Sequence, residues 1–175
     1  GGSDNSKSDV FVCKFDTALS GDASLIYSTY LGGSNEETPK GVAVDSAGNA
    51  FVFGYTASTN FPTTAGAFLP SFAGGDYDAF VAKLNPTGAA LVYSTFLGGT
   101  NRDNDGNGGG GIAVDAAGNA FVTGQTSSDD FPTKNAWQPT RFSRWGNQIG
   151  GNGFVIKLNP AGSDLVYSTF LLGVA

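Results

Sequence analysis

An internal repeat constrains the fold of this chain more than any other feature of its sequence. The string LIYSTYLGG at 25–33 returns as LVYSTFLGG at 91–99 and as LVYSTFLLG at 165–173. The string GVAVDSAGNAFVFGYT at 41–56 returns 70 residues later as GIAVDAAGNAFVTGQT at 111–126. One unit is therefore roughly 70 residues long, and the chain is built from copies of one structural unit.

Each full unit contains four candidate strands. In the first full copy they lie at 41–45, 49–56, 78–84 and 91–97, and they are short and rich in Val, Phe, Tyr and Thr. Gly, Pro, Asn and Asp bound them, which is the usual signature of strands joined by turns. No stretch of the chain shows a convincing helical period. The sequence therefore predicts an all-β fold.

The strand at 78–84 is apolar on both faces, because Phe80 and Leu84 alternate with Ala79 and Val81. A strand that is buried on both sides, in an antiparallel unit with tight turns, implies sheets stacked face to face. Four-stranded antiparallel sheets that repeat at a fixed period are typical of the blades of a β-propeller.

The turn between the first two strands of each unit has the same chemistry in both copies. Asp45 and Asp115 can accept hydrogen bonds from backbone N–H groups across the turn. Gly48 and Gly118 can take a positive φ without a Cβ clash. We therefore expect a tight hairpin at each place.

Several linked motifs carry a family resemblance. GIAVDAAGNAFVTGQT, the DFPT that follows it and GFVIKLNPAGSDLVYSTFLLG resemble the bacterial seven-bladed β-propeller (SBBP) repeat, and the copy at 41–99 matches in the same order. The resemblance covers nearly all of 9–173. It implies non-catalytic propeller repeats in secreted or surface-exposed bacterial proteins, and it brings no catalytic residues to carry over.

The number of strands predicts an incomplete propeller. Residues 1–8 read as a flexible N-terminal segment, and 9–33 supply only the last two strands of a unit. Residues 41–99 and 111–173 each supply a full blade. The total is about two and a half blades, whereas closed propellers have at least four. We expect other copies of the chain, or further blades of a longer chain, to cover the end sheets.

The composition excludes several kinds of site and partner. The chain has no histidine, which removes Ser-His-Asp triads and His-ligated metals, and its one cysteine permits no internal disulfide. The formal net charge of −6 disfavours nucleic-acid binding, and no apolar run is long enough to span a membrane. Cys13 aligns with Ala82 on a strand and is expected to be a small buried hydrophobe.

The loop at 103–108 is a candidate calcium site. Asp103, Asp105 and Asn107 stand at positions 1, 3 and 5 of a calcium-binding loop, with glycine at position 6. Position 12 is Val114 instead of a bidentate glutamate. Two interpretations stay open, namely calcium binding and a solvated loop rich in Gly and Asp.

Trp145 is a candidate ligand-binding or partner-binding residue, together with Arg141 and Arg144, in an insertion that the preceding copy lacks. An aromatic ring beside two arginines can stack on a sugar or dock on a partner. The alternative is a loop that folds over a blade edge. Trp137 aligns with Phe68 and is expected to pack.

Two further groups of polar residues are expected to be structural. The Tyr-Ser-Thr triplets at 27–29, 93–95 and 167–169 lack a general base, and they predict shared hydrogen bonding along an outer strand. Glu36 and Glu37 are adjacent carboxylates and are expected to form a solvated turn.

Together these observations lead us to expect a non-catalytic module at an extracellular or cell-surface location, with a structural, adhesive or self-assembling role. Two alternatives stay open. A calcium-dependent carbohydrate-binding module would use the 103–108 loop or Trp145. A propeller hydrolase would need different carboxylates from different blades, whereas these repeats carry the same residues.

Overall fold

The computed structural model describes residues 8–104, 109–142 and 151–171. The described residues are all-β apart from one 3-10 helix, η1 (Gly21–Ser24), so the predicted fold class is confirmed. Among them no helix is both long and apolar enough to cross a membrane. The strands are β1 (Val10–Phe15), β2 (Leu25–Leu31), β3 (Glu37–Val44), β4 (Ala50–Thr56), β5 (Asp78–Leu84), β6 (Leu91–Leu97), β7 (Gly111–Val114), β8 (Ala120–Thr126), β9 (Asn152–Leu158) and β10 (Leu165–Leu171).

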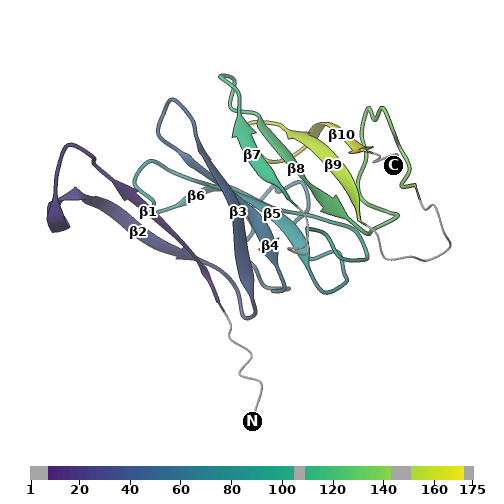
Figure 1. The fold of residues 1–175 in the computed structure, drawn as a ribbon, viewed down its shortest axis with the longest axis horizontal. Helices are drawn as coiled ribbons and strands as arrows, with labels where there is room; N and C mark the ends of the chain where they lie inside the picture. Colours follow the sequence, from purple (N-terminus) through teal and green to yellow (C-terminus); the bar gives the residue numbers. More distant parts are fainter. Residues whose placement is uncertain (1–7, 105–108, 143–150, 172–175) are drawn as a thin grey trace, which may run out of the picture.

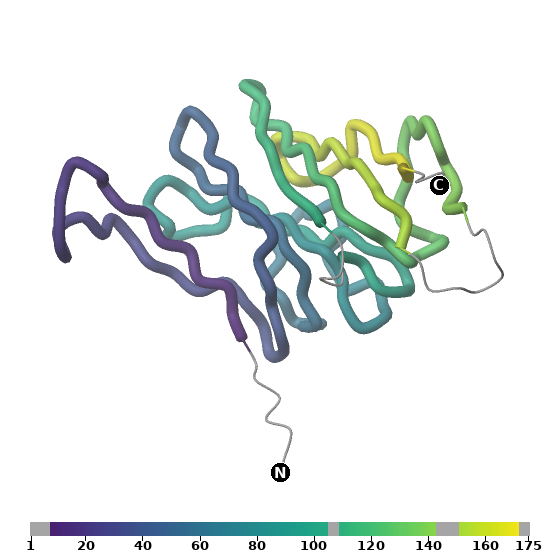
Figure 2. Tube along the Cα trace, viewed as in Figure 1, coloured from purple at the N-terminus to yellow at the C-terminus, as the bar shows by residue number. Residues whose placement is uncertain are grey.

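The strands form antiparallel sheets that follow one another along the molecule in chain order (Figure 1). β1 and β2 form the hairpin sheet, β3 to β6 form the middle sheet, and β7 to β10 form the C-terminal sheet. The trace in Figure 2 places the hairpin sheet at one end and the C-terminal sheet at the other. The described sheets do not close into a ring, which is consistent with a partial propeller of about two and a half blades.

The two four-stranded sheets use the same register. Thr56 pairs with Asp78 between β4 and β5, and Thr126 pairs with Asn152 between β8 and β9. β3 begins at Glu37, earlier than the strand expected from the sequence. An edge strand tolerates a proline at an irregularity, and the register of β3 shifts just after Pro39.

The predicted hairpin turns are confirmed. Asp45 Oδ1 accepts a hydrogen bond from the Asn49 backbone N–H at 2.9 Å, and Gly48 has a φ of +82°. Asp115 accepts the equivalent bond from Asn119 at 2.9 Å. The carboxylate replaces backbone partners across the turn, and the glycine takes a conformation that a Cβ would oppose.

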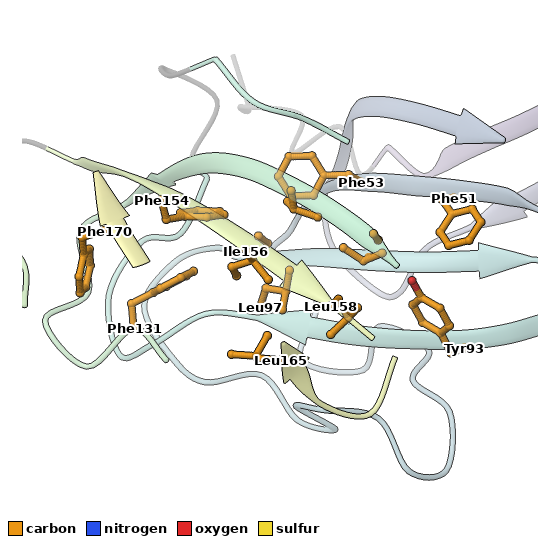
Figure 3. Packing of buried hydrophobic residues seen from close by; sticks show 14 residues of the cluster. Phe51, Phe53, Tyr93, Leu97, Phe131, Phe154, Ile156, Leu158, Leu165 and Phe170 are labelled. Carbon is orange, nitrogen blue, oxygen red and sulfur yellow. The ribbon is translucent and has the colours of Figure 1, made fainter. Parts of the chain in front are cut away.

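Stacking of the sheets explains the double-sided apolar pattern of the central strands. Every residue of β5 is buried. Phe80 and Ala82 belong to a core cluster shared with the hairpin sheet, whereas Ala79 and Val81 belong to a cluster shared with the C-terminal sheet. Figure 3 shows this second cluster, in which side chains from both sheets interdigitate. We call the two surfaces of each sheet its N-facing and C-facing sides, after the end of the stack toward which they point.

Candidate interaction surfaces at the ends of the stack

Asp103 is the one member of the proposed calcium set that the described residues include, since Asp105 and Asn107 lie outside them. Its carboxylate is fully buried. Asp103 Oδ2 accepts hydrogen bonds from the Gly99 N–H at 2.7 Å and from the Ser128 hydroxyl at 2.9 Å. The buried Asp103 carboxylate thus holds the connection between β6 and β7 against the segment that follows β8. Calcium binding by this loop stays a prediction.

Glu37 has the same role in the preceding repeat. Its carboxylate accepts hydrogen bonds from the Gly33 N–H at 3.0 Å and from the Thr56 hydroxyl at 2.6 Å. The expectation of a solvated turn is therefore wrong for Glu37, which is buried. The sequence held a signal for this role, because an acid follows the Gly-Gly pair at the same spacing in both copies, at Glu37 and Asp103.

Two neighbouring buried carboxyl groups have raised pKa values. Burial raises the pKa of Asp78 to about 7, and the nearby Asp103 and Asp130 act in the same direction. Burial also raises the pKa of Asp103 to about 6, although its hydrogen bonds oppose the change. Neither side chain is accessible to a substrate from solvent. The described residues hold no group of three or more His, Cys, Asp or Glu arranged for a metal ion.

Of the proposed ligand-binding residues, Arg141 is described, whereas Arg144 and Trp145 lie outside the described residues. Arg141 Nε lies 2.6 Å from Asp129 Oδ1 and forms an ion pair with it. Both residues belong to the connection that follows β8, so the ion pair links the beginning of that connection to a later part of it. The stacking role of Trp145 stays a prediction.

The threonines of the Tyr-Ser-Thr triplets at 93–95 and 167–169 form hydrogen bonds beside the outer strands, and Tyr27 and Tyr93 have a further role. Thr95 Oγ1 accepts from the Leu69 N–H at 2.9 Å, which holds the long β4–β5 connection against β6. The ring of Tyr93 lies so close to Gly162 that a Cβ there would be 2.3 Å from it. Tyr27 lies on Gly88 in the same way. Each tyrosine therefore contacts a turn of the next sheet, a role that sequence reasoning missed.

No described sheet covers the N-facing side of the hairpin sheet. Five repeat positions that are buried in the C-terminal sheet are exposed in the hairpin sheet, where Phe11 is 69% and Tyr30 is 80% accessible. The exposed set is Phe11, Cys13, Phe15, Leu25 and Tyr30, and the buried set is Phe154, Ile156, Leu158, Leu165 and Phe170. The chemistry of the positions is alike, so the difference comes from the absence of a covering sheet among the described residues.

Cys13 belongs to this surface, and the expectation that it is buried is wrong. The residue that aligns with it in the middle sheet, Ala82, is buried because the hairpin sheet covers it. No described sheet covers Cys13, whose thiol donates to the Ser28 hydroxyl at 3.2 Å.

We expect a water-soluble disulfide reagent to modify Cys13 in the native protein at high dilution, because the thiol is exposed. Modification should slow as protein concentration rises if association covers the N-facing side. The absorbance change of the released thiolate measures both rates. Reaction that begins only after denaturant is added would contradict the exposed position.

The C-facing side of the C-terminal sheet forms the opposite end. Leu97 is fully buried at the interface with the next sheet, whereas Leu171 at the same repeat position is 42% exposed. Phe68 packs against the core shared by the middle and C-terminal sheets, whereas its equivalent, Trp137, is 82% exposed. The expectation that Trp137 packs is therefore wrong, because no described sheet covers its side of the C-terminal sheet.

Comparison with protein-family models matches residues 26–62 and 92–132 to SBBP, a beta-propeller repeat. A search of curated proteins finds no match to the chain. The first matched segment contains β3 and β4 and nearly all of β2, and the second contains β7 and β8 and nearly all of β6. Each match thus joins the outer strand of one sheet to the first two strands of the next, and it includes the buried acid of the crossover.

Proposed function

Because the chain carries SBBP beta-propeller repeats, we propose that it is a non-catalytic propeller module that works through its two unlike end surfaces. The N-facing side of the hairpin sheet is one surface, and the C-facing side of the C-terminal sheet is the other. The module serves a structural, adhesive or self-assembling role at an extracellular or cell-surface location. Its partners are further propeller sheets, from other copies or from further blades.

The five-position contrast is the observation that carries this proposal. Inside the molecule, the C-facing side of one sheet always meets the N-facing side of the next. The two end surfaces are the same two kinds of surface, so they are complementary to each other. Contiguous exposed apolar surface of this kind marks an interaction site in soluble proteins. Head-to-tail contact of unlike surfaces gives rings or filaments.

The recurring residues support a scaffold over an enzyme. The buried acids Glu37 and Asp103 are used to fasten crossovers, and both are shielded from solvent. The low share of charged residues, 14%, suits a module that is joined through apolar and hydroxyl-rich surfaces.

The test is the solution mass of the double variant Phe15→Ser, Tyr30→Ser compared with the unaltered chain. Both side chains are exposed on the N-facing side, so their replacement should not unfold the protein but should weaken association at least tenfold. Sedimentation equilibrium over a concentration series gives the two association constants.

Val92→Ser is the matched control. Val92 is 50% exposed, and its equivalents Ile26 and Val166 are also exposed, so this position is not covered by stacking in any described sheet. The variant should associate like the unaltered chain. Equal association constants for Val92→Ser and the double variant would remove the support for a role of the N-facing side.

A further inference from the structure

Among the described residues, the hairpin sheet has no counterpart of the two strands that lie on the β4 side of β5 and on the β8 side of β9. β5 pairs with β4 on one edge and β6 on the other, and β9 pairs with β8 and β10 in the same way. Among the described residues β1 pairs with β2 alone. Its second edge offers unpaired backbone groups, which are a template for another strand.

A groove lies along this free edge. It has a volume of about 300 Å³, and β1 lines it on one side while Pro39, Lys40, Gly41 and Val42 of β3 line the other, together with Val52. Val42 and Val44 are each 63% exposed. Their equivalents Ile112 and Val114 are partly buried against the core between the middle and C-terminal sheets.

Lys14 points to the chemistry of the missing partner. Its equivalent in the middle sheet, Lys83, lies 3.2 Å from Asp45 Oδ2 and 4.6 Å from the ring centroid of Phe51. Lys157 in the C-terminal sheet has the same surroundings, with Asp115 at 3.2 Å and the ring of Phe121 at 4.8 Å.

In each of these sheets the acid and the ring come from the first two strands and the turn between them. Lys14 has neither partner among the described residues, and it donates instead to the Pro86 carbonyl oxygen at 3.4 Å. A cation with the same geometry in two sheets and no anion in the third indicates an incoming acid and aromatic ring.

From the free edge, the uncovered valines and Lys14 together, we propose that the β1 groove binds a β-hairpin of the β3–β4 type, supplied from outside the described residues. Its turn aspartate pairs with Lys14, and the phenylalanine that follows the turn lies beneath the same cation. This inference rests on the proposed function and names the partner of one further surface of the module.

The occupant is not a hairpin of a second copy folded as this one is. The two hairpins of that type in each copy, β3–β4 and β7–β8, are already paired with β5 and β9. The middle-sheet register fixes the expected pairing, since Ala50 lies opposite Leu84, and Gly54 opposite Phe80. The incoming strand should therefore place its alanine opposite Phe15.

The test uses a fluorescently labelled peptide with the sequence of residues 37–56, added to the Phe15→Ser, Tyr30→Ser variant. That variant keeps the groove-lining residues of β1 but is expected to be dissociated, so binding at the β1 edge is measured separately from end-to-end association. We expect saturable binding by fluorescence anisotropy and slower hydrogen exchange of β1 amides.

Lys14→Gln in the protein and Asp45→Asn in the peptide should each weaken binding about tenfold, and together no more than either alone, as an ion pair requires. The peptide variant leaves the protein unaltered, so its effect does not depend on how well Lys14→Gln folds. Lys83→Gln is the matched control, because a peptide that displaced β3–β4 from β5 would depend on Lys83 instead.

Three results would overturn the proposal. They are absence of peptide binding, binding that is indifferent to Lys14, and binding that depends on Lys83. Association of the unaltered chain that weakens in Lys14→Gln but not in the Phe15→Ser, Tyr30→Ser variant would likewise show that a second copy is the occupant. Absence of end-to-end association in the unaltered chain, with intact peptide binding, would count against the end-surface role alone.

Discussion

Replacing Phe80 with alanine is expected to lower the free energy of unfolding by about 3–5 kcal/mol, the usual cost of a large cavity in a packed core. Phe80 is fully buried between the hairpin and middle sheets, and its ring centroid lies 4.4 Å from that of Phe61. The Phe80 ring also lies against Gly54. Because glycine has no side chain, this neighbour cannot move to fill the cavity that the substitution leaves. Urea unfolding at constant pH measures the change.

Phe11→Ala is the matched control, because Phe11 holds the same repeat position in the hairpin sheet and is 69% exposed. In the dissociated protein this change should cost less than about 1 kcal/mol, as most exposed substitutions do. Equal losses at Phe80 and Phe11 would contradict the arrangement of sheets described above.

Asp78→Asn is expected to raise stability above neutral pH. The pKa of Asp78 rises from 3.8 to about 7 because its carboxyl group is buried, so ionising it costs up to about 4 kcal/mol more in the folded protein than in the unfolded chain. The stabilising contribution of the protonated group is complete below about pH 4 and is lost as pH rises through about 7. The raised pKa of Asp103 acts in the same direction up to about pH 6.

Thermal melts from pH 4 to pH 9 measure this dependence. The variant should match the unaltered chain near pH 4 and should melt at higher temperature near pH 9. Asp115→Asn is the control of opposite sign, since hydrogen bonds from Asn119 lower the pKa of Asp115 to about 2. Its contribution is present above about pH 4 and is lost only in strong acid. A variant at Asp78 that is less stable at every pH would contradict the account.

Local features of the fold could be predicted from the sequence because they depend on short-range chemistry. The turns at Asp45 and Asp115 follow from the side-chain acceptor and the glycine that the turn requires. The apolar alternation of β5 predicted burial on both faces, and therefore stacking. A repeat also predicts that its copies share one structure, which the matching registers of β4–β5 and β8–β9 bear out.

The burial of particular residues could not be predicted in the same way, because it depends on where a copy stands in the stack. Cys13 aligns with the buried Ala82, yet it is exposed because no described sheet covers its side of β1. Glu37 has the sequence context of a solvated turn, but the crossover folds it between strand ends. Lys83 and Lys157 pair with acids of their own sheets, Asp45 and Asp115. Lys14 holds the same repeat position, but its sheet offers no such acid among the described residues, and Lys14 donates to the Pro86 carbonyl oxygen instead.

The most direct test of the central claim, that the end surfaces are built to be covered, is the solution mass of the unaltered chain at micromolar concentration. We expect a mass well above the 17.8 kDa of one chain, falling toward that value on dilution. A stable 17.8 kDa species at every concentration, with a cooperative melt, would contradict it.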